Sequence, residues 1–382
     1  MKKTLVALAA LAATGAFAQV TVYGRLDAGY ANTVSTVTAG TAAPVEYKAN
    51  GVQSHNSVSS MWGIKGTEDL GGGMNAYFQL EQDLYTANGN TGASGAGGGA
   101  SNASGFNRTS KIGVNGAFGD IAFGRDYNPV FKIIAATDIN ALSRVSTVQM
   151  AANTGTSTVA NQVIYSSPVM SGFQVNYAYG SDDAGISGST VTTVPTTTAT
   201  TKTSNLTATY VNGPLFVAAG VGSTETVMNN GTAFTGTSAA PSFKFFAIDG
   251  VNPGVSTGDK ITGTTLAGSY DFGKFKLVGN MITGKTTTSA GVTWSASETN
   301  LGAVVPMGKL TLKAQIGTNK LAVDNRDDYT GSDMVLGADY ALSAKTAAFV
   351  TTGTFAKLAG NSGVNAYDGK VVSTAVGLKT VF

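Results

Sequence analysis

Hydrophobic and polar residues alternate along most of the chain after Gln19, and this period of two predicts β-strands. Between Gly73 and Tyr85, one face would carry Met74, Ala76, Phe78, Leu80 and Leu84, and the other Asn75, Tyr77, Gln79, Glu81 and Asp83. The same alternation recurs over residues 171–179 and 309–317. No spacing of 3.6 or seven residues is sustained, so we expect an all-β protein with almost no helix.

The connections between these segments fall into two groups that alternate along the chain. Seven are short turn signals, at 69–73, 119–120, 168–172, 212–214, 271–273, 306–308 and 343–344. Eight are long and rich in Gly, Thr, Ser and Asn, at 32–56, 87–107, 128–159, 182–203, 225–260, 286–295, 320–331 and 357–369. Together they separate sixteen predicted strands.

Long connections at one end of every strand and short turns at the other are typical of an outer-membrane barrel, with loops outside and turns toward the periplasm. A sheet in lipid must close, because an open edge would leave backbone N–H and C=O groups unpaired at several kcal/mol each. The sequence therefore predicts a transmembrane antiparallel β-barrel of sixteen strands with long outer loops and short periplasmic turns.

Composition fits this fold better than a water-soluble one. The 382 residues include 50 Gly and only 12% charged residues, against about 25% charged in an average soluble protein. The absence of Cys excludes disulfides, thiol nucleophiles and Cys-based zinc sites.

The N-terminus has the pattern of a secretory signal peptide. Lys2 and Lys3 precede an apolar stretch, and Ala16-Phe17-Ala18 supplies the small residues of a cleavage site. We expect a signal peptide over 1–18 and a single barrel domain over 19–382. Cleavage lowers Lys+Arg from 24 to 22 against 22 Asp+Glu, so the mature chain is neutral, and a nucleic-acid partner is not expected.

Several motifs give the sequence a family resemblance. They are Val20-Thr21-Val22-Tyr23-Gly24-Arg25-Leu26-Asp27-Ala28-Gly29, Trp62-Gly63-Ile64-Lys65-Gly66-Thr67-Glu68-Asp69-Leu70-Gly71-Gly72-Gly73, Phe118-Gly119-Asp120-Ile121-Ala122-Phe123-Gly124-Arg125-Asp126-Tyr127-Asn128-Pro129 and the terminal Phe382. With them the chain resembles the general diffusion porins of the Gram-negative outer membrane, specifically the neisserial and Burkholderiales-type trimeric porins.

The resemblance implies a homotrimer in which the third long loop, residues 128–159, folds into the lumen as a constriction. It also implies that Phe382 is a membrane-insertion signal for the barrel-assembly machinery. The other expected partners are outer-membrane lipid and lipopolysaccharide, together with the small hydrophilic solutes and ions that would diffuse through the pore.

Alternation also predicts which charges face that pore. Leu26 and Ala28 share the apolar face of the first strand, which leaves Arg25 on the lumenal face, and the same argument directs Lys65 and Lys111 inward. A charge facing lipid at mid-depth would cost about 2–4 kcal/mol. We expect these three cations to form a basic wall, opposite a loop that carries Lys132, Asp138 and Arg144, with Asp138 as the acidic partner.

Two departures from the family pattern weaken this wall. Met61 stands where relatives usually have Arg, and Asn161-Gln162 stands where an Asn-Arg pair is common. We therefore expect a passive diffusion channel with weak anion preference or near-neutral selectivity. A solute-selective channel and, less favoured, a secreted β-rich adhesin are the alternatives.

Other candidate chemistry is poorly supported. Residues 279–286 satisfy the phosphate-loop expression, but they lie in an alternating segment with no helix after it. His55 is the only His and is expected to be a solvated loop residue. The loop aspartates, including Asp182 and Asp328, lack the spacing of a calcium loop. We expect no enzymatic activity, no cofactor and no metal site.

Overall fold

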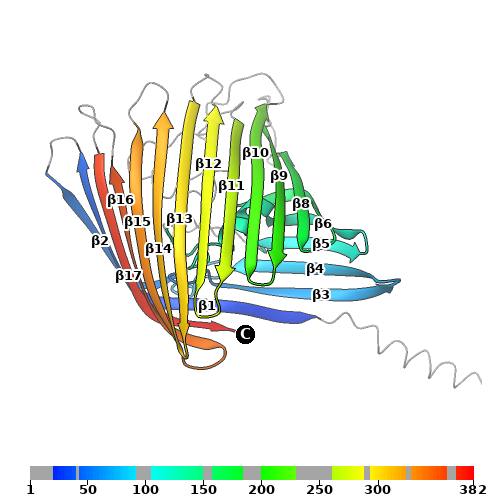
Figure 1. The fold of residues 1–382 in the computed structure, drawn as a ribbon, viewed down its shortest axis with the longest axis horizontal. Helices are drawn as coiled ribbons and strands as arrows, with labels where there is room; N and C mark the ends of the chain where they lie inside the picture. Colours follow the sequence, from blue (N-terminus) through cyan, green and yellow to red (C-terminus); the bar gives the residue numbers. More distant parts are fainter. Residues whose placement is uncertain are drawn as a thin grey trace, which may run out of the picture.

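The structure, a computed structural model, describes residues 20–39, 43–91, 105–148, 157–183, 199–228, 260–287, 293–323, 328–358 and 367–382. These residues form one antiparallel sheet of seventeen strands that curves into a barrel (Figure 1). The first strands are β1 (Thr21–Ala39), β2 (Val45–Ser54), β3 (Met61–Gly71), β4 (Met74–Asp83), β5 (Thr109–Gly116), β6 (Gly119–Tyr127), β7 (Thr158–Ser166), β8 (Phe173–Asp183) and β9 (Ala199–Asn212). They are followed by β10 (Leu215–Met228), β11 (Lys260–Asp271), β12 (Lys276–Thr287), β13 (Thr293–Met307), β14 (Leu310–Val323), β15 (Tyr329–Ala341), β16 (Thr346–Leu358) and β17 (Tyr367–Val381).

The barrel closes through its first and last strands. β1 pairs with β17 from Arg25↔Val381 to Ala39↔Tyr367. On its other side β1 pairs with β3 over its first residues and with β2 over the rest. Because β2 and β3 share this one position, the seventeen strands occupy sixteen positions around the ring. The predicted all-β, sixteen-stranded antiparallel barrel is thus confirmed.

The short turns lie close to where the sequence indicates them. Residues 72–73, 213–214 and 308–309 each join consecutive strands directly. The turn expected at Gly119-Asp120 lies two residues earlier, at Ala117-Phe118, and β6 already begins at Gly119.

One prediction about the loops is wrong. Residues 32–56 were expected to form a single long connection, but β1 continues to Ala39 and β2 covers Val45–Ser54. The two strands pair from Ala28↔Ser54 to Val37↔Val45. Thr and Val make up five of the six residues 33–38, and this explains the result, because β-branched side chains suit an extended strand even where the sequence is polar.

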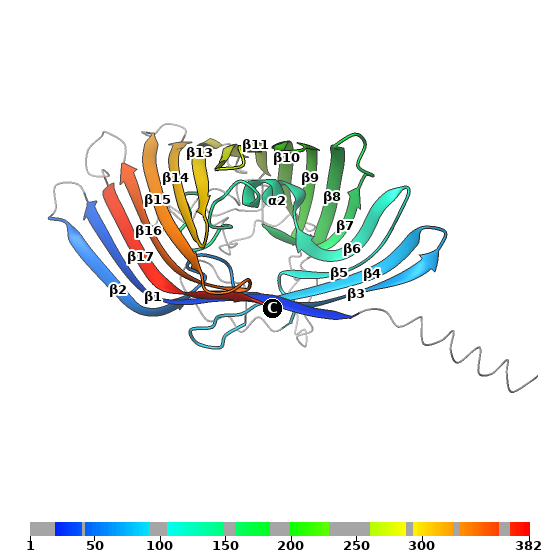
Figure 2. The same cartoon turned by 60° about the horizontal axis from the view of Figure 1, so that its bottom comes forward.

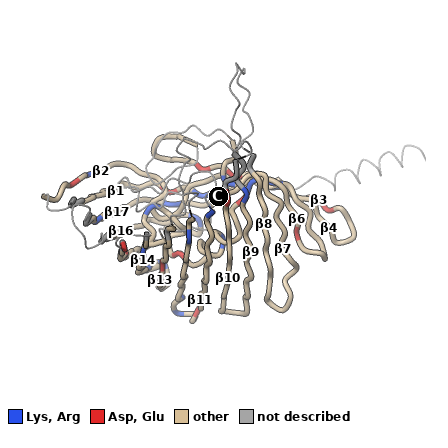
Figure 3. Tube along the Cα trace, turned by 90° about the horizontal axis from the view of Figure 1, so that it is seen from above, with Lys and Arg blue, Asp and Glu red and all other residues tan. Residues whose placement is uncertain are grey.

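The two faces of the wall have opposite character. Lumenal Thr265 on β11 is fully buried, whereas its neighbour Leu266 on the outer face is 53% exposed. The same contrast holds on β14 between Gln315 and Ile316. Figure 3 shows that most residues along each strand are uncharged. Apolar side chains outside and polar ones inside are what a barrel surrounded by lipid requires.

A short helix, α2 (Pro129–Ala135), lies within the curve of the sheet rather than on its outside (Figure 2). No helix in the described ranges is long and apolar enough to cross a membrane. The predicted signal peptide, 1–18, lies outside the described residues.

Candidate functional site

The three predicted wall cations share the inner face of neighbouring strands. In the strand register, Arg25 on β1 is paired with Met61 on β3. Lys65 on β3 is paired with Gln79 on β4, and Gln79 with Lys111 on β5. Directly opposed residues lie on the same face of a sheet, so Arg25, Lys65 and Lys111 all face the lumen.

Their immediate contacts differ. The Arg25 Nε donates to the Ser59 carbonyl at 2.7 Å. The Lys65 Nζ lies 5.0 Å from the centroid of the Tyr23 ring, a cation–π distance. The Lys111 Nζ lies 2.8 Å from a carboxylate oxygen of Asp126. Of the three, Lys111 alone forms an ion pair with a described carboxylate.

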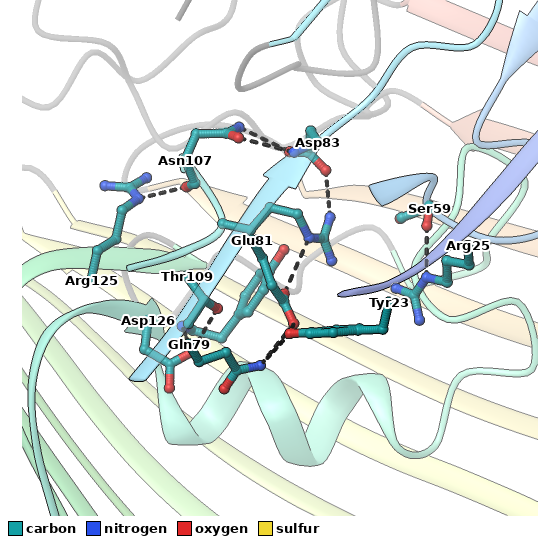
Figure 4. Close-up of polar contacts among 12 residues, drawn as sticks. Tyr23, Arg25, Ser59, Gln79, Glu81, Asp83, Asn107, Thr109, Arg125 and Asp126 are labelled. Carbon is teal, nitrogen blue, oxygen red and sulfur yellow. Dashed lines mark hydrogen bonds and ion pairs between the residues drawn. The ribbon is translucent and has the colours of Figure 1, made fainter. Parts of the chain in front are cut away.

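A fourth cation, Arg108, belongs to this wall and was missed from the sequence. Its Nη1 lies 2.5 Å from the Asp83 carboxylate and its Nε 3.7 Å from that of Glu81. Its guanidinium stacks over the Tyr127 ring at 5.2 Å. Figure 4 shows the two carboxylates, Glu81 and Asp83, close to each other on β4. Arg108 precedes β5 directly after a predicted loop, so alternation gave no signal for it.

Glu81 is held in place by hydrogen bonds from two other lumenal side chains. The Tyr23 hydroxyl donates to its Oε1 at 2.7 Å, and the Gln79 Nε2 donates to the same oxygen at 2.8 Å (Figure 4). The inward direction of Glu81 and Asp83 follows from alternation, but their pairing with Arg108 depends on strand register.

The expected constriction loop enters the lumen after β6. Asn128 caps helix α2, its side chain accepting from the Phe131 N–H, and Pro129 occupies the first turn. This Asn-Pro pair is a helix-start signal that could have predicted the helix. Ile133 packs on Ala218 and Ala267 of the wall, and the Lys132 Nζ lies 2.8 Å from Asp126.

After the helix, the loop lies along the inner faces of the later strands. The Asn280 amide on β12 donates to Thr137 at 3.0 Å, and the Ile139 N–H donates to the Gln315 side chain on β14 at 3.1 Å. Farther on, Val145 packs in a buried apolar cluster with Ala296, Leu321, Val335 and Phe355. Residues 128–148 thus cross the lumen from β6 to β16, whereas the last two residues of the expected loop, Thr158 and Val159, already belong to β7.

The other two predicted loop residues have local roles. Asp138 is buried, and its carboxylate accepts from the Leu142 N–H at 2.5 Å and from the Ser146 hydroxyl at 3.0 Å. The Arg144 N–H donates to the His55 carbonyl at 2.8 Å. Burial lowers the pKa of the Arg144 guanidinium. Asp138 as partner of the basic wall stays a prediction, while the carboxylates in contact with wall cations are Glu81, Asp83 and Asp126.

An inward segment, residues 55–60, separates β2 from β3 and meets this loop. Asp27, fully buried on β1, holds it: one carboxylate oxygen accepts from the Asn56 N–H, and the other from those of Ser57 and Val58. The expectation that His55 is a solvated loop residue is wrong. Its side chain is 8% exposed and stacks on Tyr85 at 4.5 Å.

The two departures from the family pattern occupy buried lumenal positions. Met61 is 6% exposed and lies across from Arg25 and Asp83 in register. The Gln162 amide donates to the carbonyls of Asp126 and Val159 at 2.8 and 2.6 Å. Neither position adds a charge to the wall.

Residues 279–286 lie within strand β12, so they form no phosphate-binding loop. Within the described ranges no group of three or more His, Cys, Asp and Glu residues could hold a metal ion.

Phe382 completes the closure of the barrel. Its N–H donates to the Gly24 carbonyl at 3.0 Å, and the Gly24 N–H donates to its carbonyl at 3.2 Å. A Cβ at position 24 would lie 2.5 Å from the Phe382 ring and 2.8 Å from the Met61 carbonyl. Only glycine therefore lets the terminal ring lie against β1.

A closed barrel with an apolar exterior, a charged interior and a loop across its lumen defines a transmembrane diffusion channel. The chain belongs to the Gram-negative porin family, whose model matches residues 4–357. It is an outer-membrane porin and not an enzyme, and the secreted adhesin is excluded.

Known proteins support this assignment. Outer membrane porin protein 32 of Delftia acidovorans is 27% identical over 91% of this chain and 88% of its own length. The anion-selective porin from Comamonas acidovorans has a TM-score of 0.67 at 22% identity, covering 96% of this chain and all of that one. The trimer form of OmpT from Vibrio cholerae has a TM-score of 0.62 at 14% identity, covering 95% and 99%. At these identities the two structures support the fold alone.

Proposed function

We propose that this porin is a passive channel for small hydrophilic solutes and ions with weak anion preference or near-neutral selectivity. The observation that carries the proposal is the balance of charge in one lumenal cluster, formed by side chains from β1, β3–β6 and helix α2. Five cations, Arg25, Lys65, Arg108, Lys111 and Lys132, surround the three carboxylates Glu81, Asp83 and Asp126. The difference is two positive charges.

Ion pairing within this group weakens its effect on permeating ions. Arg108, Lys111 and Lys132 each contact a carboxylate within 4 Å. At longer range a close pair acts as a dipole, whose field falls off faster than that of a single charge. Arg25 and Lys65 form no ion pair with a described residue, and they supply the residual preference for anions. The similar structure from Comamonas acidovorans is named an anion-selective porin, and a preference for anions is also what we propose for this channel.

Single-channel recording in planar bilayers with a salt gradient tests the proposal. We expect stepwise conductance and a small reversal potential of the sign that anion flow produces. A marked cation preference would contradict it. Saturable block of the current by a sugar or organic acid would instead favour a solute-selective channel.

We propose that residues 128–159 form the constriction, with Arg25, Lys65 and Lys111 on the wall and Lys132, Asp138 and Arg144 on the loop. The anchoring of 137–148 on the far wall supports this assignment. The segment 149–156 lies outside the described residues. Deleting 137–147 should raise single-channel conductance while the barrel still assembles, and an unchanged conductance would contradict the proposal.

We also propose a homotrimer. The trimer form of the OmpT structure is the support, and it comes from a fold-level similarity. Electrophoresis of unheated samples and chemical cross-linking should give a species of three chains, and a single-chain species in mild detergent would contradict it.

Lipopolysaccharide is a further proposed partner. Lys202, Lys260, Lys285 and Lys320 are exposed on the outer face near the loop ends of their strands. A groove of about 760 Å³ lies beside Lys285 and Lys320 and is lined largely by Ser and Thr side chains. Ammonium and hydroxyl groups of this kind suit lipid phosphates. Replacing Lys285 and Lys320 by Gln should weaken lipopolysaccharide binding, whereas Lys309 and Lys345, at the turn end, serve as controls.

Two proposals concern the ends of the chain. Cleavage after Ala18 predicts that the mature protein begins at Gln19, which N-terminal sequencing checks. Phe382 as a signal for the barrel-assembly machinery predicts that Phe382→Ala slows assembly in cells more than it slows refolding in detergent. Equal effects in both assays would leave Phe382 with a purely structural role.

A further inference from the structure

A groove crosses the outer face of the barrel over strands β9–β13, on the opposite side of the wall from helix α2. Its volume is about 630 Å³, and most of the side chains that line it are apolar. Leu266 and Met281 border it and are 53% and 46% exposed, whereas their neighbours Thr265 and Asn280 are buried in the lumenal wall. The groove therefore opens toward lipid and not toward the pore.

The floor of the groove is made of small residues. Ala208 of β9 is opposite Ala219 of β10, and Gly268 of β11 is opposite Gly279 of β12. A Cβ at Gly268 would meet nothing closer than the Phe216 carbonyl oxygen at 3.4 Å, an ordinary contact, and the backbone of Gly268 lies outside the left-handed region. Neither packing nor backbone conformation thus requires glycine there. Glycine inside a strand weakens the strand and often marks the close approach of a ligand or another backbone, and at Gly268 it keeps the groove open.

The groove moves away from the turn end of the barrel as it crosses the strands. Tyr210, at one end, lies two residues before the end of β9, and the first residue of β8, Phe173, lies beside it in register. Gly268 lies three residues before the end of β11, and Leu301, at the other end, lies six residues before the end of β13. Four strand spacings of about 4.8 Å give the groove a length of about 19 Å. One leaflet covers about half of a hydrocarbon core of about 30 Å, so a sloping path of this length suits one acyl chain.

The end of the groove near the turns is partly polar. The rings of Phe173 and Tyr210 lie 4.3 Å apart. The Tyr210 hydroxyl accepts from the Asn212 Nδ2 at 3.1 Å, which leaves its own proton available to another oxygen. Lys274, in the turn that follows β11, is exposed at the same edge of the barrel. Tyrosine and lysine are typical anchors at the level of lipid head groups, whereas no charged side chain is among the described residues that line the groove itself.

We propose that the groove binds one acyl chain of a phospholipid, with the ester and phosphate oxygens near Tyr210 and Lys274 and the end of the chain near Leu301. The turns of such barrels face the periplasm, so this phospholipid belongs to the leaflet opposite the proposed lipopolysaccharide site. Lipid tails are as apolar as the barrel wall, so the chain is held by its fit in the groove and by the contacts of its head group.

The polar end of the groove favours a lipid over a neighbouring barrel. A second barrel would present a mostly apolar face at this level and would leave the Tyr210 hydroxyl without an acceptor. Because the groove lies outside the pore, the lipid site does not rest on the ion selectivity proposed above.

Retention of phospholipid by the full-length protein tests the site. Protein refolded in detergent without lipopolysaccharide is placed in vesicles of phosphatidylethanolamine and phosphatidylglycerol, extracted in mild detergent, washed and analysed by native mass spectrometry. We expect one tightly held phospholipid per chain. Gly268→Leu fills the groove and should lower retention about tenfold or more. Tyr210→Phe keeps the ring but removes the hydroxyl, and it should lower retention about twofold to tenfold.

Two residues of β15 provide matched controls. Ala338 and Tyr340 share the outer face of this strand with the exposed Leu336. Ala338 lies three residues before the end of its strand, as Gly268 does, and Tyr340 lies one residue before it. Ala338→Leu and Tyr340→Phe should therefore retain phospholipid as the wild type does.

Photochemical labelling tests the direction of the bound chain. In the same vesicles, a phospholipid with a diazirine near the carboxyl end of its chain should label the region of Phe173 and Tyr210 more than the rest of the outer face. With the diazirine at the far end of the chain, the labelling should move to β13, around Thr299 and Leu301. Excess lipopolysaccharide should leave both patterns unchanged, because its own proposed site lies in the other leaflet.

The proposal is overturned if the wild type retains no more phospholipid than Gly268→Leu, or if both probes label the outer face evenly. It is also overturned if Gly268→Leu changes the number of chains per particle while retention stays the same, which would indicate that a second copy of this chain covers the groove. Should Gly268→Leu fail to fold, Tyr210→Phe and the labelling patterns still decide the outcome.

Discussion

The carboxylate of Asp126 on β6 lies 2.8 Å from the ammonium of Lys132 on helix α2, so an ion pair joins the barrel wall to the loop that crosses its lumen. The same carboxylate oxygen lies 2.8 Å from the Lys111 Nζ on β5. One buried negative charge thus compensates two cations that face the pore, and its removal should expose both to permeating ions.

Asp126→Asn should make the channel more anion-selective. Loss of one negative charge within several ångströms of the ion path changes the anion-to-cation permeability ratio by about twofold to fivefold, given the screening of a water-filled pore. Reversal potentials in a salt gradient measure this ratio.

Asp69→Asn is the matched control for that measurement. Asp69 accepts from the Gly71 N–H in an exposed turn, away from the lumen. It should shift the reversal potential much less than Asp126→Asn does, and equal shifts would show that selectivity depends on overall charge rather than on the wall.

Gly24→Ala should destabilise the barrel where its ends meet. The added methyl would lie 2.5 Å from the Phe382 ring and 2.8 Å from the Met61 carbonyl, and such overpacking costs about 1–3 kcal/mol. The temperature at which the folded band disappears on gels should fall. At Gly337 an added Cβ meets nothing nearer than 3.7 Å, so Gly337→Ala should keep the wild-type temperature; an equal loss in both variants would refute the packing argument.

Asp27→Ala should loosen the inward segment, 55–60. Its carboxylate accepts the backbone N–H groups of Asn56, Ser57 and Val58. Three donors would be left without their acceptor, at a cost of about 3 kcal/mol or more. Unfolding in urea and single-channel current noise report the effect. For comparison, Asp271→Ala removes an acceptor in an exposed turn and should cost about 1 kcal/mol or less.

His55 should make stability depend on pH. Burial is the largest influence and lowers the pKa of His55 below its ordinary 6.5, although Asp83 and Asp27 favour the charged form. The unfolded chain then binds a proton that the folded chain does not, so His55 reduces stability as pH falls below about 6.5 and has no such effect above it. The urea concentration at the midpoint of unfolding should be lower at about pH 5 than at about pH 8. His55→Gln should show a smaller drop, and an identical pH profile would contradict this assignment.

Period-two alternation was enough to predict the strands and their two faces, because lipid on one side and water on the other impose opposite demands on successive side chains. It also predicted that Arg25, Lys65 and Lys111 point inward. Alternation says nothing about where a polar strand ends, however, and for that reason the extension of β1 and the whole of β2 were taken for a loop.

Contacts between distant residues could not be predicted in the same way. The pairing of Arg108 with Asp83 depends on the register of β4 and β5. The burial of His55 depends on an inward segment whose composition resembles that of a solvated loop. In both cases the signal is three-dimensional, and a pattern along one strand does not contain it.

The anchoring of the constriction loop has a consequence for the order of assembly. Its partners on the wall come much later in the chain: Ile139 binds Gln315, 176 residues away, and Asn140 binds Thr351, 211 residues away. Contacts of such separation form slowly, and these require β14–β16 to be present. The nascent barrel must therefore pass through a stage in which the constriction loop is not yet anchored and the pore is wider. The pore reaches its final width only when the last strands have paired with the first.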